Sequence, residues 1–154
     1  MYLEKIISGQ TIRLSISDMD KVSLIEDLTD LIVENGKGSD RDKIISDILD
    51  REAKGSTGLE NGIAIPHAKS EGVTELVGAL GISPQGIDFE SMDGKPSHLI
   101  FLILAPPQET TRYLKALSAV AFIGKRPEMI SRLKTAASPE EVLSILGEAE
   151  GGNT

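Results

Sequence analysis

The residue of this sequence best suited to covalent chemistry is a histidine that directly follows a proline. Pro66 fixes its own φ angle and holds Ile65 in an extended conformation, so His67 is expected at the rigid end of a strand. Imidazole is neutral and nucleophilic near pH 7, and it is a good leaving group once its nitrogen carries a phosphoryl group. His67 is therefore a candidate phosphoryl acceptor.

Two features upstream of this histidine could hold a phosphate. Ser56, Thr57 and Gly58 offer two hydroxyls and adjacent backbone N–H groups, a set that can surround an anion. Arg51 is the nearest upstream guanidinium, and its planar fork suits phosphate oxygens. Plainer roles stay open on the residues alone: a turn or packing position for His67, and a capped loop for the Ser-Thr-Gly run.

Composition excludes several other kinds of site. The 154 residues include two histidines and no cysteine, so disulfides, zinc-thiolate sites, iron–sulfur clusters and cysteine nucleophiles are excluded, and we expect neither a metal nor a cofactor. Sixteen Lys and Arg against 24 Asp and Glu leave a net charge of −8, which argues against nucleic-acid binding. Only five residues are aromatic, so the core must consist of Leu, Ile, Val and Ala.

The sequence shows neither a targeting signal nor a membrane span. The first residues carry charges where a signal peptide needs an apolar run, and the longest apolar stretch, 99–107, is far shorter than the ~20 residues that cross a bilayer. We therefore expect a soluble cytoplasmic protein with no direct membrane insertion.

Hydrophobic periodicity places the elements that must position these residues. A strand is predicted over 12–16, a helix over 20–35, a second helix from Ser39 as its N-cap to Gly55, and a strand over 76–82. Pro84-Gln85-Gly86 predicts a turn that leads to a short returning strand over 87–89. The unbroken apolar run 99–104 predicts a central strand covered on both faces.

The C-terminal third is predicted to be helical. Helices are expected over 108–124, from Pro127, and from a capping box that begins at Ser138. Together these elements predict an α/β fold: a single-domain sandwich with a mixed parallel and antiparallel sheet and helices on both faces. We place the domain at 1–148 and expect a disordered tail over 149–154.

The whole sequence resembles a known family. The run 51–69, which contains Arg51-Glu52, Gly55-Ser56-Thr57-Gly58 and Asn61-Gly62-Ile63-Ala64-Ile65-Pro66-His67, closely resembles the active-site signature of enzyme IIA components of the bacterial phosphotransferase system (PTS). The class is the fructose/mannitol type (type-2 EIIA), which includes the nitrogen-regulatory IIA proteins. The resemblance continues through Gly86-Ile87-Asp88-Phe89, Asp93-Gly94-Lys95-Pro96, Ala105-Pro106 and Ser138-Pro139-Glu140-Glu141-Val142.

The resemblance implies a phosphocarrier with the family's α/β sandwich and no cofactor. His67 would accept a phosphoryl group from the phosphorylated histidine phosphocarrier protein and pass it to a IIB domain of a sugar permease. In a nitrogen-type protein, phosphorylation would instead switch the binding of regulatory target proteins. Arg51 would help to hold the phosphate, with Ser56, Thr57 and Gly58 in the loop beside it.

One position departs from the family pattern. Tyr113 stands where a second histidine is usual, and a phenol can donate a hydrogen bond to phosphate but carries no charge at neutral pH. The neighbouring Arg112 could compensate for this loss. Alternatively, the chain is a non-catalytic regulatory binding module that kept the fold with weak or no phosphotransfer. We expect His98 to be structural and Lys69 to be a solvated flank of the motif.

Overall fold

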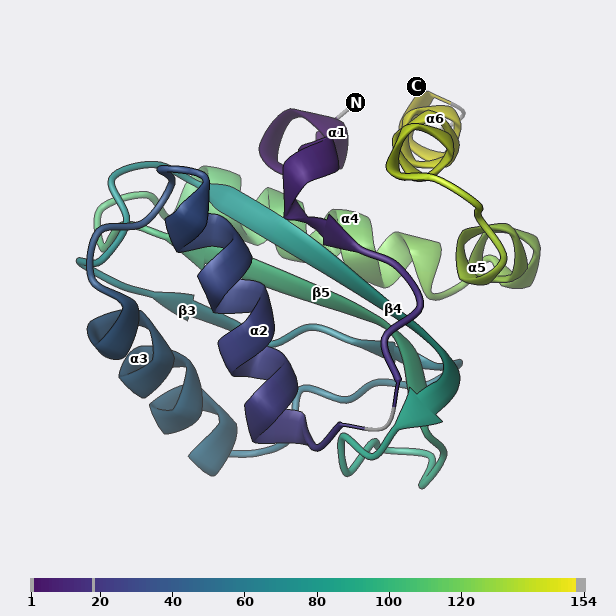
Figure 1. Cartoon of the computed structure of the whole chain (residues 1–154), viewed down its shortest axis with the longest axis horizontal. Coiled ribbons are helices and arrows are strands. Elements are labelled where there is room, and N and C mark those ends of the chain that lie inside the picture. Colours follow the sequence, from purple (N-terminus) through teal and green to yellow (C-terminus); the bar gives the residue numbers. More distant parts are fainter. Residues whose placement is uncertain (1, 18, 152–154) are drawn as a thin grey trace.

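A five-stranded mixed sheet lies between two layers of helices (Figure 1). This computed structural model describes residues 2–17 and 19–151. The elements, in chain order, are α1 (Leu3–Ile6), the short 3-10 helix η1 (Gly9–Thr11), β1 (Ile12–Arg13), α2 (Lys21–Glu34), α3 (Arg41–Ala53), β2 (Ile63–Ala64), β3 (His67–Lys69), β4 (Val77–Ile87), β5 (Ser97–Ala105), α4 (Thr111–Ile123), α5 (Pro127–Lys134) and α6 (Pro139–Gly151).

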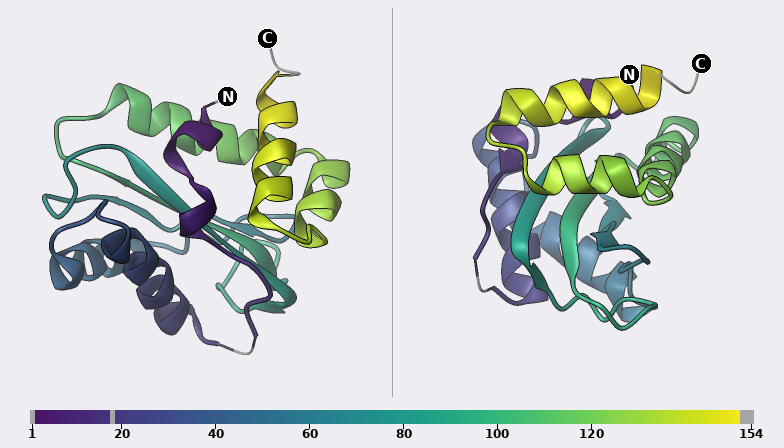
Figure 2. Two further views of the ribbon diagram at one scale, coloured as in Figure 1. Left: turned by 45° about the horizontal axis from the view of Figure 1, so that its top comes forward. Right: turned by 90° about the vertical axis from the view of Figure 1, so that its right-hand side faces the viewer.

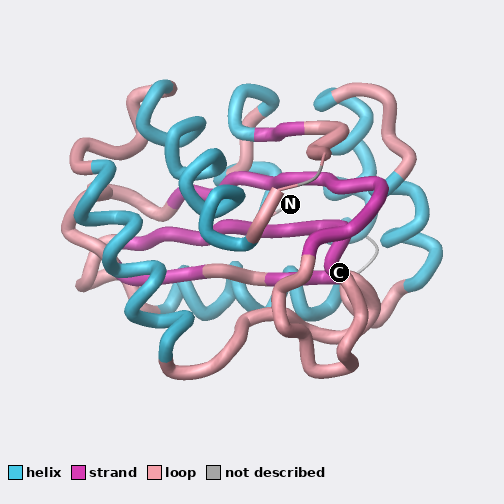
Figure 3. The backbone as a smooth tube through the Cα atoms, turned by 60° about the horizontal axis from the view of Figure 1, so that its bottom comes forward, coloured by secondary structure: helices cyan, strands magenta, loops and turns pink. Residues whose placement is uncertain are grey.

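The predicted central strand is confirmed as β5. It pairs antiparallel with β4 on one side and parallel with both β2 and β3 on the other, while β1 pairs parallel with β4 at the far edge. The sheet is therefore mixed, as expected, and Figure 3 shows its strands running between helices. Helices α2 and α3 lie in the chain between the parallel neighbours β1 and β4, whereas β2 and β3 reach their parallel partner β5 through β4.

The strands bury both of their faces, in two separate clusters of side chains. Along β5, Phe101 and Ile103 pack on one face with residues of α1, α4, α5 and α6. Ile100, Leu102 and Leu104 pack on the other face with α2 and α3. This alternation is the two-residue period of a strand, and it explains why the run has no polar position.

The two ends of the described chain lie on the same side of the molecule (Figure 2). The short α1, which the sequence analysis missed, packs against α6. At the start of α6, Ser138 accepts a hydrogen bond from the Glu141 N–H at 3.1 Å, as a capping residue does, although the Glu141 carboxylate bonds Ala137 instead of closing the expected box. The helix continues to Gly151, past the boundary predicted at 148, and residues 152–154 of the expected tail lie outside the described residues.

Three local predictions need correction. The chain does not turn back at Pro84: β4 continues to Ile87 through a shift in register, with Gly86 at φ +94° and its N–H bonded to the Ser83 hydroxyl at 3.0 Å. A glycine that relieves an irregularity within a strand was thus mistaken for a turn signal. Asp40, not Ser39, caps α3, with its carboxylate 3.1 Å from the Lys43 N–H. The first strand is also shorter than predicted, because Ser15 adopts a positive φ of +56°.

Among the described residues, no helix is long and apolar enough to cross a membrane.

Candidate functional site

The histidine singled out by the sequence lies on an edge strand of the sheet. His67 begins β3 and pairs with Ile103 of the central strand, while the preceding Ile65 and Pro66 are buried. Its Nδ1 lies 2.5 Å from the Ile65 carbonyl oxygen. A carbonyl can only accept, so Nδ1 carries the proton and donates it. The neutral ring then has its lone pair on Nε2, which is the nucleophilic nitrogen.

The surroundings of His67 favour the neutral ring. Burial is the main cause that lowers the pKa of His67 below its usual value, and the positive charge of Arg51 lowers this pKa further. The hydrogen bond to Ile65 and the negative charge of Glu52 act in the opposite direction. The net direction is downward, so His67 is available as a nucleophile at neutral pH.

Tyr113 faces this histidine from helix α4. The two ring centres are 6.0 Å apart, with 55° between the ring planes. Burial raises the pKa of Tyr113 to about 12, although the charge of Arg51 opposes the shift, so the phenol stays protonated and can donate at neutral pH. Its hydroxyl makes no hydrogen bond with any residue that the structure describes.

Lys69 lies closer to the site than a solvated flank would. Its ammonium is 5.9 Å from the centre of the Tyr113 ring and donates to the Thr110 hydroxyl at 2.6 Å. The side chain is nevertheless exposed. Lys69 therefore places a positive charge at the rim of the site, on the side of α4.

Arg51 is a further residue that both the sequence and the structure place at the site. It lies in the last turn of α3 and its guanidinium Nη1 donates to the Gly55 carbonyl oxygen at 2.9 Å. Its charge acts on both His67 and Tyr113. The predicted group of histidine, arginine and tyrosine is thus assembled from α3, β3 and α4.

The donors of the predicted phosphate loop are engaged within the protein. The Ser56 hydroxyl donates to the Phe89 carbonyl oxygen at 2.5 Å and accepts from the Gly58 N–H at 3.0 Å. Thr57 directs both its N–H and its hydroxyl to the carboxylate of Glu52. Direct phosphate contact by Ser56, Thr57 and Gly58 therefore stays a prediction, whereas their bonds to neighbouring segments are visible.

Glu52 is a residue at the site that the sequence analysis did not single out. Its side chain is 6% exposed, and its carboxylate lies 2.6 Å from the ammonium of Lys21. The available signal was the position of this acid directly after Arg51, inside the family-like run. Its ion-pair partner lies 31 positions earlier in the chain, and no local spacing rule connects the two.

Two residues considered from the sequence lie elsewhere. His98 is the second residue of β5 and bonds the Ser83 carbonyl oxygen through Nδ1 at 2.9 Å, in agreement with a structural role. It precedes Ile103, the partner of His67, by five strand residues, or about 16 Å along the sheet. Arg112 pairs with Glu109 at 3.9 Å and lines a cavity beside α1, so it does not replace the missing histidine.

No group of three or more His, Asp or Glu side chains within the described part of the chain is arranged to hold a metal ion. The chemistry available here is that of a neutral imidazole beside a guanidinium and a phenol. This set can form a bond to an electrophilic phosphorus and can stabilise the negative oxygens around it.

Comparison with known proteins gives a consistent picture. Residues 5–149 match the family model described as "Phosphoenolpyruvate-dependent sugar phosphotransferase system, EIIA 2". A fructose-specific PTS EIIABC component of Bacillus subtilis (strain 168) is 35% identical over 148 residues, which are 96% of this chain but only 23% of that protein. A fructose-specific PTS EIIA component of Haloferax volcanii is 38% identical over 128 residues, and the match covers 83% of each chain.

Solved structures agree with the fold. The crystal structure of nitrogen regulatory protein IIA-Ntr from Neisseria meningitidis superimposes with a TM-score of 0.87 at 32% identity, covering 95% of this chain and 99% of that one. The mannitol enzyme IIA of Escherichia coli, solved in complex with its phosphorylated enzyme IIB, has a TM-score of 0.79 at 22% identity and covers 92% of this chain and 96% of its own. The latter likeness concerns the fold alone.

Proposed function

Because the chain belongs to the EIIA 2 family of the phosphoenolpyruvate-dependent sugar phosphotransferase system, we propose that it is a phosphocarrier whose acceptor is His67. The observation that carries the proposal is the hydrogen bond from Nδ1 of His67 to the Ile65 carbonyl oxygen. It fixes the tautomer and leaves Nε2 with the lone pair. The ring is held by a buried Ile-Pro pair, so the nucleophile is positioned before any donor arrives.

The transfer step balances without a cofactor. The lone pair of Nε2 forms a nitrogen–phosphorus bond while the bond between phosphorus and the nitrogen of the donor's phosphohistidine breaks, and the electron pair of that bond returns to the donor ring. The proton stays on Nδ1 of His67, and its hydrogen bond to the Ile65 carbonyl oxygen supports the positive charge that develops on the ring. The donor is the phosphorylated histidine phosphocarrier protein.

Two side chains are proposed to stabilise the phosphoryl group in transit. Arg51 supplies a permanent positive charge that acts on His67, and its guanidinium retains donors beyond the one used by Gly55. Tyr113, whose ring lies 6.0 Å from that of His67, supplies a protonated hydroxyl in place of the usual histidine. Ser56, Thr57 and Gly58 complete the proposal as the loop beside the phosphate.

The phosphoryl group on His67 has two proposed uses. Transfer to a IIB domain of a sugar permease is favoured by the fructose-specific relatives, whereas a switch in the binding of regulatory target proteins is favoured by the nitrogen-regulatory structure that superimposes over nearly the whole chain. A neighbouring gene for a sugar permease would support the first, and a neighbouring gene for an alternative sigma factor the second.

One observation favours a second candidate function. Tyr113 cannot carry the positive charge that a histidine would bring to the phosphate. A regulatory binding module with weak or no phosphotransfer would tolerate this change, since binding does not require stabilisation of the phosphoryl group in transit.

A direct experiment tests the phosphocarrier. The chain is incubated with phosphoenolpyruvate, enzyme I and the histidine phosphocarrier protein, and its intact mass is measured under alkaline conditions. We expect the mass of one phosphoryl group, lost again in acid, in the natural sequence and in His98→Gln but not in His67→Ala. Absence of the gain in the natural sequence overturns the proposal and favours the binding module, whereas its persistence in His67→Ala overturns His67 as the acceptor.

A further inference from the structure

Glu52 lies in the interior with more donors directed at it than a surface carboxylate collects. Its Oε2 is 2.6 Å from Nζ of Lys21 and 3.3 Å from the Thr57 N–H, and its Oε1 accepts from the Thr57 hydroxyl. Both oxygens are therefore occupied. A buried ion pair of this kind adds little stability, because the cost of removing two charges from water offsets their attraction.

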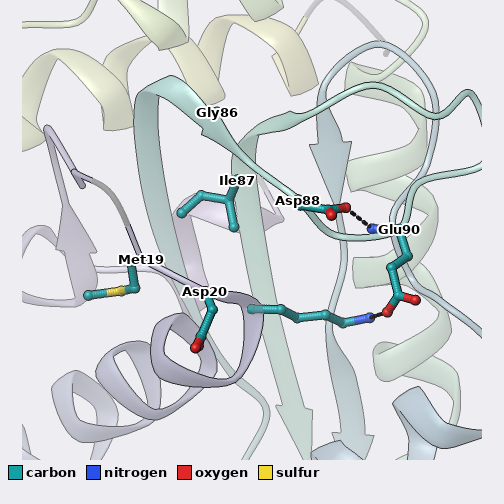
Figure 4. A pocket seen from close by; sticks show the side chains of 7 residues that line it. Met19, Asp20, Gly86, Ile87, Asp88 and Glu90 are labelled. Carbon is teal, nitrogen blue, oxygen red and sulfur yellow. Dashed lines mark hydrogen bonds and ion pairs between the residues drawn. The ribbon is translucent and has the colours of Figure 1, made fainter.

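The partner Lys21 connects the site to a neighbouring cavity. It begins α2, is 16% exposed, and lies 5.1 Å from the centre of the Phe89 ring and 3.7 Å from the carboxylate of Glu90. Figure 4 shows this cavity with Met19 and Asp20 on one side and Asp88 and Glu90 on the other, and Lys21 also lines it. The cavity has a volume of about 470 Å³. Lys21 thus joins the start of α2 to the end of α3 and to the segment after β4.

The segment held by Glu52 is fixed at further points. The Ser56 hydroxyl bonds Phe89, and the Met92 N–H donates to the Gly58 carbonyl oxygen at 3.2 Å. Gly58 packs so closely on Ser91 that an added Cβ would lie 2.9 Å from its Cα atom. Residues 55–58 are therefore clamped between the end of α3 and the segment 89–92.

The clamped segment in turn holds Arg51. The guanidinium Nη1 bonds the carbonyl oxygen of Gly55, the first residue of the segment. Glu52 also follows Arg51 directly, so a shift of one backbone position moves both residues. The contacts form a continuous path from the ion pair, through Thr57 and Gly55, to the group proposed to stabilise the phosphate.

From this path we propose that Glu52, paired with Lys21, is a positioning residue for phosphoryl transfer: it holds the 55–58 segment that orients the guanidinium of Arg51 beside His67. The inference rests on the proposed function. It assigns the alignment of the arginine to a buried ion pair between α2 and α3, which acts through the Gly55 carbonyl oxygen that Arg51 binds.

The test uses two variants and a control. Glu52→Gln keeps the size of the side chain, but its amide nitrogen cannot accept from Thr57 or Lys21. Lys21→Met removes the cation and keeps the carboxylate. Asp50→Asn is the matched control, since it removes an exposed carboxylate from the same turn region of α3. The first readout is the rate of phosphoryl transfer from the histidine phosphocarrier protein, measured on protein shown to be folded by its thermal unfolding.

For transfer, we expect Glu52→Gln to lower kcat by roughly 10- to 100-fold, with KM for the donor changed less than about threefold, because a displaced stabilising group acts on the transition state. Asp50→Asn should transfer at the natural rate. A Glu52→Gln variant that is folded and transfers normally overturns the proposal, as does a loss of the same size in Asp50→Asn.

The second readout does not require transfer. The charged and titratable groups that act on His67 are Arg51 and Glu52 from α3, with Lys69 and Tyr113 near it on β3 and α4. Lys21→Met leaves the negative charge of Glu52 unpaired and releases the segment that holds Arg51. Because Arg51 lowers the pKa of His67, both changes should raise this pKa, as measured by NMR of the imidazole, and Asp50→Asn should leave it unchanged. A lower or unchanged pKa of His67 in Lys21→Met contradicts the coupling even if the chain is never phosphorylated.

Discussion

Burial of the His67 ring makes the stability of the protein depend on pH. Burial lowers the pKa of His67 in the folded chain below the value of about 6.5 that it has when unfolded. On acidification the unfolded chain therefore binds more protons than the folded chain, and the free energy of unfolding decreases as the pH is lowered through that range. The contribution is fully present above about pH 6.5 and is lost as the pH falls through the lower, folded-state pKa.

This sign leads to a measurement with urea. We expect the free energy of unfolding to fall between pH 7 and pH 5 more steeply in the natural protein than in His67→Gln. Carboxylates common to both proteins cancel in the difference. A difference that stays constant over this range would show that His67 is not buried as a neutral ring.

Tyr113 makes a prediction about rate. Its ring lies 6.0 Å from the imidazole, so we expect Tyr113→Phe to remove one hydrogen bond to a charged phosphate and to slow transfer by about 10-fold, the equivalent of about 1.4 kcal/mol. Tyr113→His should increase the rate, since imidazole can carry a positive charge. Single-turnover kinetics with the phosphorylated donor measure both. Equal rates in all three proteins would mean that this position does not contact the phosphate.

The chemistry-bearing residues of the site differ in how far the sequence reveals them. His67 can be singled out from the sequence because Pro66 constrains the backbone before it. Tyr113 can be singled out because it replaces the histidine that is usual in the family. The ion pair of Glu52 with Lys21 is different: it depends on how two helices pack, and each residue alone looks like an ordinary surface charge. Long-range electrostatic pairing is set by tertiary structure.

Helix α3 begins at a side-chain cap and ends at the candidate site. Asp40 caps its start, and Arg51 and Glu52 lie at its end. We expect Asp40→Ala to reduce the free energy of unfolding by about 1 kcal/mol, because the Lys43 N–H loses its partner. Asp40→Asn, which keeps an acceptor, should cost less, and Ser46→Ala at an exposed position of the same helix should be close to neutral. Chemical denaturation of the three variants decides; equal stability of Asp40→Ala and Asp40→Asn would exclude the cap.

Segments with strong hydrophobic periodicity were predicted well, whereas segments with irregular backbone were not. Every position of the run 99–104 is apolar, so this run predicts only a buried strand. The segment Pro84-Gln85-Gly86 is compatible with two structures, a turn or a bulged continuation of a strand. The pairing of β4 with β5 beyond this point selected the second. Helix α1 escaped notice because its four residues are too few for a period to appear, and its contact with α6 lies at the opposite end of the chain.

Two substitutions in β5 test separately the two clusters of buried side chains on opposite faces of the sheet. Phe101 and Leu102 are adjacent, completely buried, and point to opposite faces of the sheet. We expect Phe101→Ala to cost about 3–5 kcal/mol and Leu102→Ala about 2–5 kcal/mol of unfolding free energy. Leu114→Ala, at an exposed leucine of α4, should change stability by less than about 0.5 kcal/mol. A small effect at either strand position would mean that one face of the sheet is not a packed core.

The short strands at the borders of the sheet bear on how the protein behaves when it is crowded. One border consists of the two residues of β1, and the other is divided between β2 and β3 by Pro66, which lacks an N–H. Neither border offers a long row of unpaired backbone groups on which a second chain could add a strand. Together with a net charge of −8, this disfavours self-association and fibril growth at high concentration. The same proline that precedes the proposed nucleophile thus also interrupts the row of backbone donors along one border of the sheet.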